Sequence, residues 1–244
     1  MCQPDEECLA HGIMTTIASN LQAARNAITE AATEAGRQAS DICLLAVSKT
    51  FAPDLLREAY HAGQTCFAES YVQEALEKIS ALRDLNIEWH YIGPIQSNKT
   101  RAIAENFIWV HSVDRLKIAE RLSEQRPAHL PPLQVCLQVN ISREDSKSGV
   151  SPDEVGVLAH AIAKLPKLKL RGLMAVPAPG DKVAAQRLPF AQLRKLQDLL
   201  NQQGLQLDTL SMGMSHDFTA AIAEGATIVR IGTAIFGDRI YLEA

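Results

Sequence analysis

The sequence predicts an α/β protein, a single (β/α)8 TIM-type barrel with an extra N-terminal helix. The chain has 244 residues, close to the roughly 250 that such a barrel needs. Short apolar runs alternate with amphipathic stretches, as expected for parallel strands joined by helices. No Gly/Ser linker, charge run or repeat divides the chain, so we expect one domain. A doubly wound open sheet is the alternative that this pattern leaves open.

The predicted elements run from a long first helix to a short last strand. Residues 1–13 show no periodicity and form a polar N-terminal extension to the domain 14–244, with Met14 as an alternative start. The first helix covers Met14–Gly36 and ends at a glycine, a common helix stop. The predicted strands are Ile42–Ser48, Thr65–Ala68, Glu88–Ile92, Phe107–Val110, Leu133–Asn140, Leu170–Ala175, Thr209–Met212 and Thr227–Ile231. The helices between them are Pro53–Ala62, Val72–Leu82, Ser97–Glu105, Asp114–Glu124, Pro152–Lys164, Ala184–Gln203 and Phe218–Gly225.

Composition and charge exclude several classes of protein. The net charge is −4, so there is no basic excess of the kind that binds nucleic acid. No apolar run approaches the ~20 residues of a membrane helix, and the start lacks a secretory signal, so we expect a cytoplasmic protein. Cys43, Cys66 and Cys136 lie in apolar runs and are expected to act as small buried hydrophobes. Cys2 and Cys8 have no partners at zinc-site spacing.

Lys49 ends the first apolar strand and is the first candidate for chemistry. Functional groups of these barrels gather just beyond the carboxyl ends of the strands. An amine beside apolar neighbours there would have its pKa lowered by desolvation, which favours the neutral form that a Schiff base requires. A lysine that simply leaves the strand for solvent is the alternative.

The last two strands carry a candidate phosphate site. Gly213 and Ser215 follow strand seven, and Gly232 and Thr233 follow strand eight. Barrels commonly bind phosphate between these two loops, where glycines let backbone N–H groups approach an anion and hydroxyls donate to it. The arrival of glycine and hydroxyl residues at both strand ends therefore predicts a phosphate ligand.

Three further polar residues, Arg230, His90 and Lys147, have two interpretations each, and a fourth, His111, has one. Arg230 either points into the barrel mouth or pairs with an acid such as Glu69 or Asp217. His90 either approaches the ligand or is a hydrogen-bonded core residue, and core or rim packing is expected for His111, which has no evident partner. Lys147, in the polar loop after strand five, either meets an anion or lies in solvent.

Seven runs of the sequence form a specific combination: Leu44–Thr50, Trp89–Lys99, Gln138–Ser142, Ser146–Gly149, Arg171–Met174, Ser211–Ser215 and Arg230–Gly237. Together they resemble the pyridoxal phosphate homeostasis protein family (YggS/PROSC-like), which has the fold of the alanine racemase N-terminal barrel. The resemblance implies that Lys49 holds pyridoxal 5′-phosphate (PLP) as a Schiff base and that Ser215, Gly232 and Thr233 hold its phosphate. It implies that Arg230 faces the pyridine nitrogen, where a fixed positive charge discourages protonation.

The sequence departs from the family pattern near the expected cofactor. Ser70 stands where the family usually has asparagine, and His216 stands where it usually has an acid. Phe218-Thr219 likewise replaces the common Met-Glu. None of these changes alters Lys49, so PLP binding is expected to persist with altered affinity.

The resemblance implies a regulatory protein or carrier of PLP rather than a strong catalyst. Such proteins act in intracellular PLP homeostasis and in the balance of amino acids and keto acids. Apo PLP enzymes and free amino acids are the expected partners, and a monomer is expected because no second domain follows the barrel. An amino-acid racemase is the alternative, but racemases of this fold take a second base from that domain. A barrel enzyme acting on a sugar phosphate through Lys49 is the third possibility.

Overall fold

In a computed structural model, the protein folds as a closed barrel of parallel strands. The structure describes residues 16–144, 147–178 and 183–237, so the predicted extension at 1–13 lies outside it. The strands pair in the order β1-β2-β3-β4-β5-β6-β7-β8, and β8 returns to pair with β1. This closure confirms the (β/α)8 prediction and excludes the open sheet. The strands are β1 Cys43–Val47, β2 Cys66–Glu69, β3 Glu88–Tyr91, β4 Trp109–Val113, β5 Leu133–Gln138, β6 Leu168–Met174, β7 Thr209–Met214 and β8 Ile228–Ile231.

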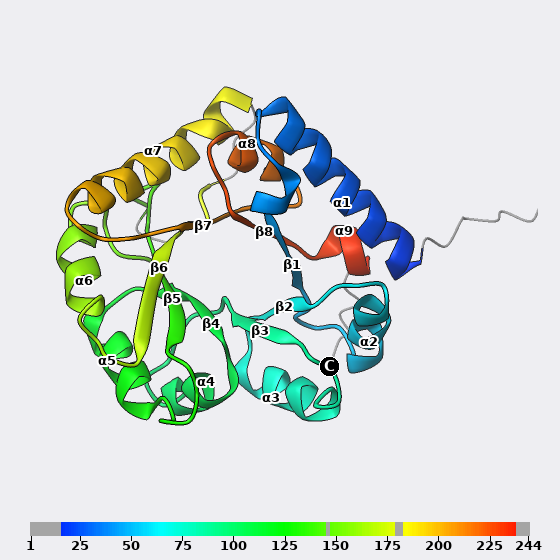
Figure 1. Ribbon diagram of the computed structural model, residues 1–244, viewed down its shortest axis with the longest axis horizontal. Helices are drawn as coiled ribbons and strands as arrows, with labels where there is room; N and C mark the ends of the chain where they lie inside the picture. The colour runs from blue at the N-terminus through cyan, green and yellow to red at the C-terminus, as the bar shows by residue number, and fades with distance from the viewer. Residues whose placement is uncertain (1–15, 145–146, 179–182, 238–244) are drawn as a thin grey trace, which may run out of the picture.

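Helices form an outer ring around the strands (Figure 1). They are α1 Ile17–Glu34, α2 Pro53–His61, α3 Val72–Ala81, α4 Thr100–Asn106, α5 Leu116–Gln125, α6 Val155–Ile162, α7 Val183–Gln202, α8 Phe218–Ala223 and α9 Thr233–Phe236. A short 3₁₀ turn, η1 Ala39–Asp41, leads into β1. Within these described ranges, no helix is both long and apolar enough to cross a membrane.

The extra N-terminal helix α1 covers the outside of the barrel beside α8 and α9 (Figure 1). Its buried face consists of Ile17, Leu21, Ala24, Ile28, Ala31 and Ala32, spaced as one stripe of a helix. Hydrogen bonds tie the helix and the residues just after it to the barrel. Asn20 Nδ2 donates to Ile235 O at 2.9 Å, and Arg37, three residues beyond the helix end, donates to Ala226 O at 2.7 Å. The helix therefore fastens α8 and α9, which flank the last strand, to the barrel wall.

Some elements differ from the prediction in ways that matter for the site. Strand β4 was expected to end at Val110 but continues to Val113, so His111 lies within the strand. An irregular register between Val110 and Val113 lets β4 keep pairing with β5 beyond the apolar run. The short helix α9 was not among the predicted elements, because its four residues are too few for a helical period.

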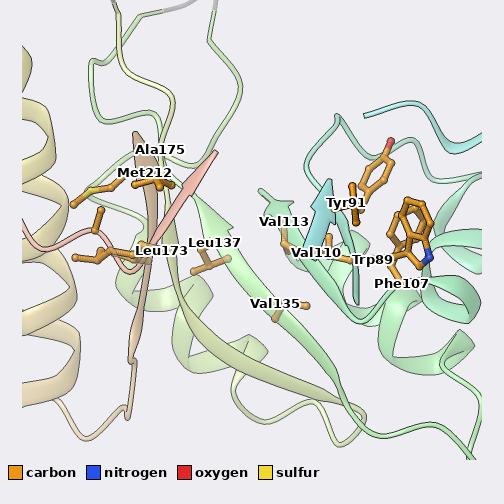
Figure 2. Packing of buried hydrophobic residues seen from close by; sticks show 14 of the residues in the cluster. Trp89, Tyr91, Phe107, Val110, Val113, Val135, Leu137, Leu173, Ala175 and Met212 are labelled. Carbon is orange, nitrogen blue, oxygen red and sulfur yellow. The ribbon is translucent and has the colours of Figure 1, made fainter. Parts of the chain in front are cut away.

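The strand residues that face outward pack beneath the helices in the main hydrophobic core. Figure 2 shows part of this layer, in which Trp89 and Tyr91 of β3 lie near Phe107. Because side chains alternate across a strand, the neighbours Glu88 and His90 point into the barrel. The barrel interior is therefore polar in part, and its apolar members include the small cluster of Leu45, Val47, Ala68 and Ile228.

Candidate functional site

A cavity of about 320 Å³ opens at the carboxyl ends of the strands. Its size falls at the lower end of the roughly 300–1,000 Å³ typical of small-molecule sites. Six of the seven predicted site residues line it: Lys49, Ser70, Ser215, Arg230, Gly232 and Thr233. The other lining residues are Val47, Ile92, Met174, Val176, Met214 and His216. The cavity thus combines an apolar wall with one amine, one guanidinium and several hydroxyls.

Lys49 is half-buried and lies two residues beyond the end of β1. Hydrogen bonds to the backbone of its neighbours Ser48 and Thr50 hold this segment in place. The carbonyl of Ser48 accepts a hydrogen bond from Lys78 Nζ at 2.7 Å, and Ser48 Oγ donates to Glu69 Oε1 at 2.6 Å. On the other side, Thr50 adopts a left-handed backbone with φ of 71°. A non-glycine residue in that region costs of order 1–3 kcal/mol and persists only where its surroundings hold it.

The support for this segment is a buried ion network between β2 and α3. Lys78 Nζ lies 2.8 Å from Glu69 Oε1 and also pairs with Glu74, whose Oε1 accepts from the N–H of Thr50 at 2.5 Å. Lys78 is 3% exposed and Glu69 is fully buried, and this burial raises the pKa of Glu69 although the Lys78 charge opposes the shift. The suggested pairing of Glu69 with Arg230 is therefore wrong. Glu69 faces the helix side of β2, where Lys78 lies.

Ser70 reaches the cavity because the loops after β2 and β3 approach each other closely. A Cβ on Gly93 would lie 2.1 Å from Ser70 O, so only glycine permits this approach. Tyr91 Oη donates to Ser70 O at 3.2 Å and to Pro94 O at 3.1 Å, which ties the two loops together.

The end of β7, which extends to Met214 and not only to the predicted Met212, and the turn that follows it have the tight backbone that the phosphate hypothesis requires. Gly213 has a φ of 93°, and a Cβ there would lie 2.6 Å from Ala221 Cβ in α8. Asp217 is buried, and its Oδ1 accepts from the N–H of Met214 at 2.6 Å, which closes the turn. Ser215, at the tip of this turn, is exposed at the cavity rim. Its hydroxyl is therefore available to an anion.

Arg230 lies at the floor of the cavity and is 4% exposed. Its guanidinium donates to Ser211 O at 2.6 Å, to Ser211 Oγ at 2.8 Å and to Ala175 O at 2.9 Å. Burial lowers the pKa of Arg230 to about 10, although the charge of Asp217 opposes the shift. The side chain therefore keeps its charge at neutral pH, held in place by neutral oxygens.

His90 is not among the lining residues and belongs to a hydrogen-bonded layer beneath the cavity. Its Nδ1 lies 2.8 Å from His111 Nε2, and its Nε2 lies 2.9 Å from Glu88 Oε1. His111 Nδ1 lies 2.7 Å from Ser211 Oγ, the hydroxyl that Arg230 also contacts. Burial lowers the pKa of His111 well below its usual 6.5, so this ring is neutral. His111 is fully buried, as its expected core packing requires, but the sequence did not indicate its partners His90 of β3 and Ser211 of β7.

Lys147 is also absent from the cavity lining. Its backbone is held within the loop after β5, where the carbonyl accepts from Asn140 Nδ2 at 3.1 Å and the N–H donates to Glu144 O at 3.0 Å.

The chain is similar to known proteins along most of its length. A family model described as the N-terminal domain of alanine racemase matches residues 19–240. A pyridoxal phosphate homeostasis protein from Pseudomonas aeruginosa is 61% identical over 228 residues, which cover 93% of this chain and 98% of that protein. The protein of the same name from Escherichia coli K12 is 52% identical, with 93% and 99% covered.

A solved structure of PipY from Synechococcus elongatus with PLP bound superposes with a TM-score of 0.81 and 37% identity, covering 91% of this chain and all of that one. PipY is a member of the COG0325 family. On the matched range, the barrel and these identities, the chain belongs to the pyridoxal phosphate homeostasis protein family, built on the alanine racemase N-terminal domain.

Proposed function

We propose that this protein binds PLP in the cavity at the barrel mouth and acts in intracellular PLP homeostasis, without strong catalysis. One observation carries the proposal: a lysine amine, a buried guanidinium and two hydroxyl-bearing loops converge on a single cavity of about 320 Å³. The names of the relatives and the PLP-bound PipY structure support the same ligand.

The chemistry of the lining fits the parts of PLP. The phosphate is an anion, and Ser215, Thr233 and the backbone at Gly232 offer hydrogen-bond donors on one side. The ring is flat and largely apolar, and Val47, Ile92 and Met174 supply an apolar surface for it. The aldehyde of PLP reacts with a primary amine, and Lys49 carries the amine that lines this cavity. We therefore assign Lys49 as the residue that holds the cofactor covalently, as a Schiff base.

Arg230 supports a role in binding rather than in catalysis. PLP, when bound to an enzyme, stabilises negative charge next to the reacting carbon by withdrawing electrons into its ring. Arg230 remains charged and cannot accept a proton at neutral pH. Facing the ring nitrogen, it would oppose protonation there and weaken this electron withdrawal. His90 then has a supporting role. It contacts His111, which in turn contacts Ser211, and the Ser211 hydroxyl accepts a hydrogen bond from Arg230.

The wider role in homeostasis is part of the same proposal. A protein that keeps PLP in a shielded but exchangeable form would buffer the free aldehyde and supply apo PLP enzymes. It would also influence the balance of amino acids and keto acids through those enzymes. The monomeric state and the cytoplasmic location expected from the sequence belong to this proposal. Sedimentation and cell fractionation test them.

Absorption spectroscopy during a PLP titration tests the binding proposal. The unmodified protein should bind one PLP per chain and develop the visible absorption of a lysine-linked PLP. Lys49→Ala should abolish this absorption, while Lys147→Ala, a lysine from the polar loop that does not line the cavity, should leave it unchanged. Equal spectra for Lys49→Ala and the unmodified protein would overturn the assignment.

Incubation with L-alanine separates the regulatory role from the racemase alternative. We expect no measurable racemisation or transamination by the PLP-loaded protein on the timescale of ordinary PLP enzymes, whose kcat values are roughly 1–10³ s⁻¹. Racemisation at such rates would make the protein an enzyme and contradict the proposed role.

A further inference from the structure

Three side chains with different metal-binding groups meet at the base of the barrel, at the end opposite the PLP cavity. Cys66 of β2 and Glu88 of β3 are Cα partners across the sheet, and His90 follows Glu88 by two residues on the same face. A thiol sulfur, a carboxylate oxygen and a ring nitrogen from these residues all lie within 4.8 Å of one another. We propose that Cys66, Glu88 and His90 form a binding site for a Zn²⁺-type transition metal ion.

The donor set selects the class of metal. A thiolate with an imidazole and a carboxylate suits Zn²⁺, whereas Mg²⁺ and Ca²⁺ prefer oxygen ligands alone. Ligand atoms bound to one Zn²⁺ lie about 3.3–3.8 Å apart, so movements of about an ångström bring the three atoms to metal distances. His90 Nε2 and Glu88 Oε1 are 2.9 Å apart, and the ion would replace the proton between them. Three protein ligands leave the fourth position to water.

The surroundings of His90 are those of a metal ligand. A histidine that binds a metal through one nitrogen usually donates a hydrogen bond through the other, which fixes the orientation of the ring. Here Nε2 faces Glu88, and Nδ1 lies 2.8 Å from His111 Nε2. The His90 ring also stacks on Trp109, with centroids 5.6 Å apart and planes within 5°. The His90 ring is thus held in place by Trp109 and His111 of β4 before any ion binds.

An ion can reach this site without passing through the PLP cavity. A second pocket of about 320 Å³ at the base of the barrel is lined by residues including Cys43, Gln64, Thr65 and Cys66. The Glu88 side chain is 41% exposed, so one ligand already faces solvent. The nearby cation Arg171 is paired with Asp208 at 2.8 Å, which offsets its charge.

The second thiol at this end of the barrel belongs to Cys43. Together with Cys66 it lines the pocket through which an ion would enter. Cys43 is not within ligand distance of all three donors, so we assign it as a neighbour of the site and not as a ligand.

Co²⁺ titration of the full-length, PLP-loaded protein tests the site, because a thiolate bound to Co²⁺ gives a charge-transfer absorption in the near ultraviolet. The starting protein carries Cys2→Ser and Cys8→Ser, which removes the two other thiols that the N-terminal segment offers. We expect one Co²⁺ per chain with this absorption, and its loss when Zn²⁺ is added. Cys66→Ser should abolish the absorption, whereas Cys136→Ser, a fully buried thiol elsewhere in the barrel, should retain it.

Glu88→Gln provides a second test that leaves the sulfur in place. Loss of even an outer-shell partner typically weakens metal binding 10–100-fold, so loss of this ligand charge should weaken Co²⁺ binding by at least about tenfold. The PLP absorption of each variant reports that the barrel is folded. Absence of a thiolate–Co²⁺ absorption in the starting protein, or an equal absorption in Cys66→Ser, would overturn the proposal and leave PLP binding unaffected.

Discussion

Replacing Lys78 by methionine removes the cation from the buried network that fixes the backbone on both sides of Lys49. Lys78 Nζ donates to Ser48 O at 2.7 Å and to Glu69 Oε1 at 2.8 Å, and it also pairs with Glu74. Methionine has a similar length but no charge. In the variant the Glu69 carboxylate, which is fully buried, would lose its nearest positive charge. Its Oε2 already lacks a hydrogen-bond partner among the residues that the structure describes.

The expected cost follows from this burial. Removing one partner of a buried ion pair typically destabilises a protein by about 3–5 kcal/mol, because the remaining charge is left uncompensated. For a chain of this size each kcal/mol lowers the midpoint of thermal unfolding by roughly 2–4 °C, so we expect a fall of about 6–20 °C. Replacing Glu69 by glutamine in the same chain removes the stranded charge. The double variant Lys78→Met/Glu69→Gln should therefore be more stable than Lys78→Met alone.

Urea unfolding of the two single variants and the double variant measures these free energies as a double-mutant cycle. Lys117→Met is the matched control, because Lys117 is an exposed lysine of α5. We expect its effect to stay within about 0.5 kcal/mol, as for most surface substitutions. PLP affinity should also fall in Lys78→Met, since the backbone around Lys49 loses its support. A cost for Lys78→Met no larger than that for Lys117→Met, or a double variant as unstable as the sum of the singles, would refute the reasoning.

The remaining predictions concern the PLP cavity. Ser215→Ala removes a hydrogen bond to a charged group, worth about 1.5–3 kcal/mol, and should lower PLP affinity about ten- to a hundredfold in equilibrium dialysis. Pyridoxal, which lacks the phosphate, should be affected little, and equal losses would contradict the phosphate assignment. Gly213→Ala forces a Cβ into a left-handed backbone and to 2.6 Å from Ala221 Cβ, so urea unfolding should show a loss of more than about 1 kcal/mol. An unchanged unfolding midpoint would refute this steric argument. Arg230→Glu replaces the cation with a carboxylate, so bound PLP should be converted slowly to the pyridoxamine form when alanine is added. Absorption spectroscopy measures this conversion. A variant that retains PLP but does not react would contradict the role given to Arg230.

The barrel was predictable because its strands and helices have distinct periods along the chain. Each apolar run that precedes a candidate site residue became a strand, and the carboxyl ends of parallel strands meet at one rim. Lys49, Ser215 and Gly232 therefore reached one cavity although more than 160 residues separate Lys49 from the other two.

What the sequence did not predict depends on contacts between strands. His90 and His111 lie on neighbouring strands, and nothing along the chain indicates that their rings meet. The partner of Glu69 is similarly hidden, because Lys78 lies on the face of α3 that packs against β2 and a helical pattern would place a lysine in solvent. The interpretation of Cys43 and Cys66 as small buried hydrophobes is wrong, since both are half-buried and only Cys136 among the described cysteines is buried. It also overlooked Glu88, which the register brings opposite Cys66.

The central claim is that Lys49 holds PLP in this cavity, and borohydride reduction followed by peptide mass spectrometry tests it most directly. Reduction converts a lysine-linked PLP into a stable amine that survives proteolysis. We predict that a single peptide, the one containing Lys49, carries the mass of the reduced phosphopyridoxyl group at nearly one per chain. Modification at another lysine, or modification spread over several exposed lysines with Lys49 unlabelled, would contradict the account.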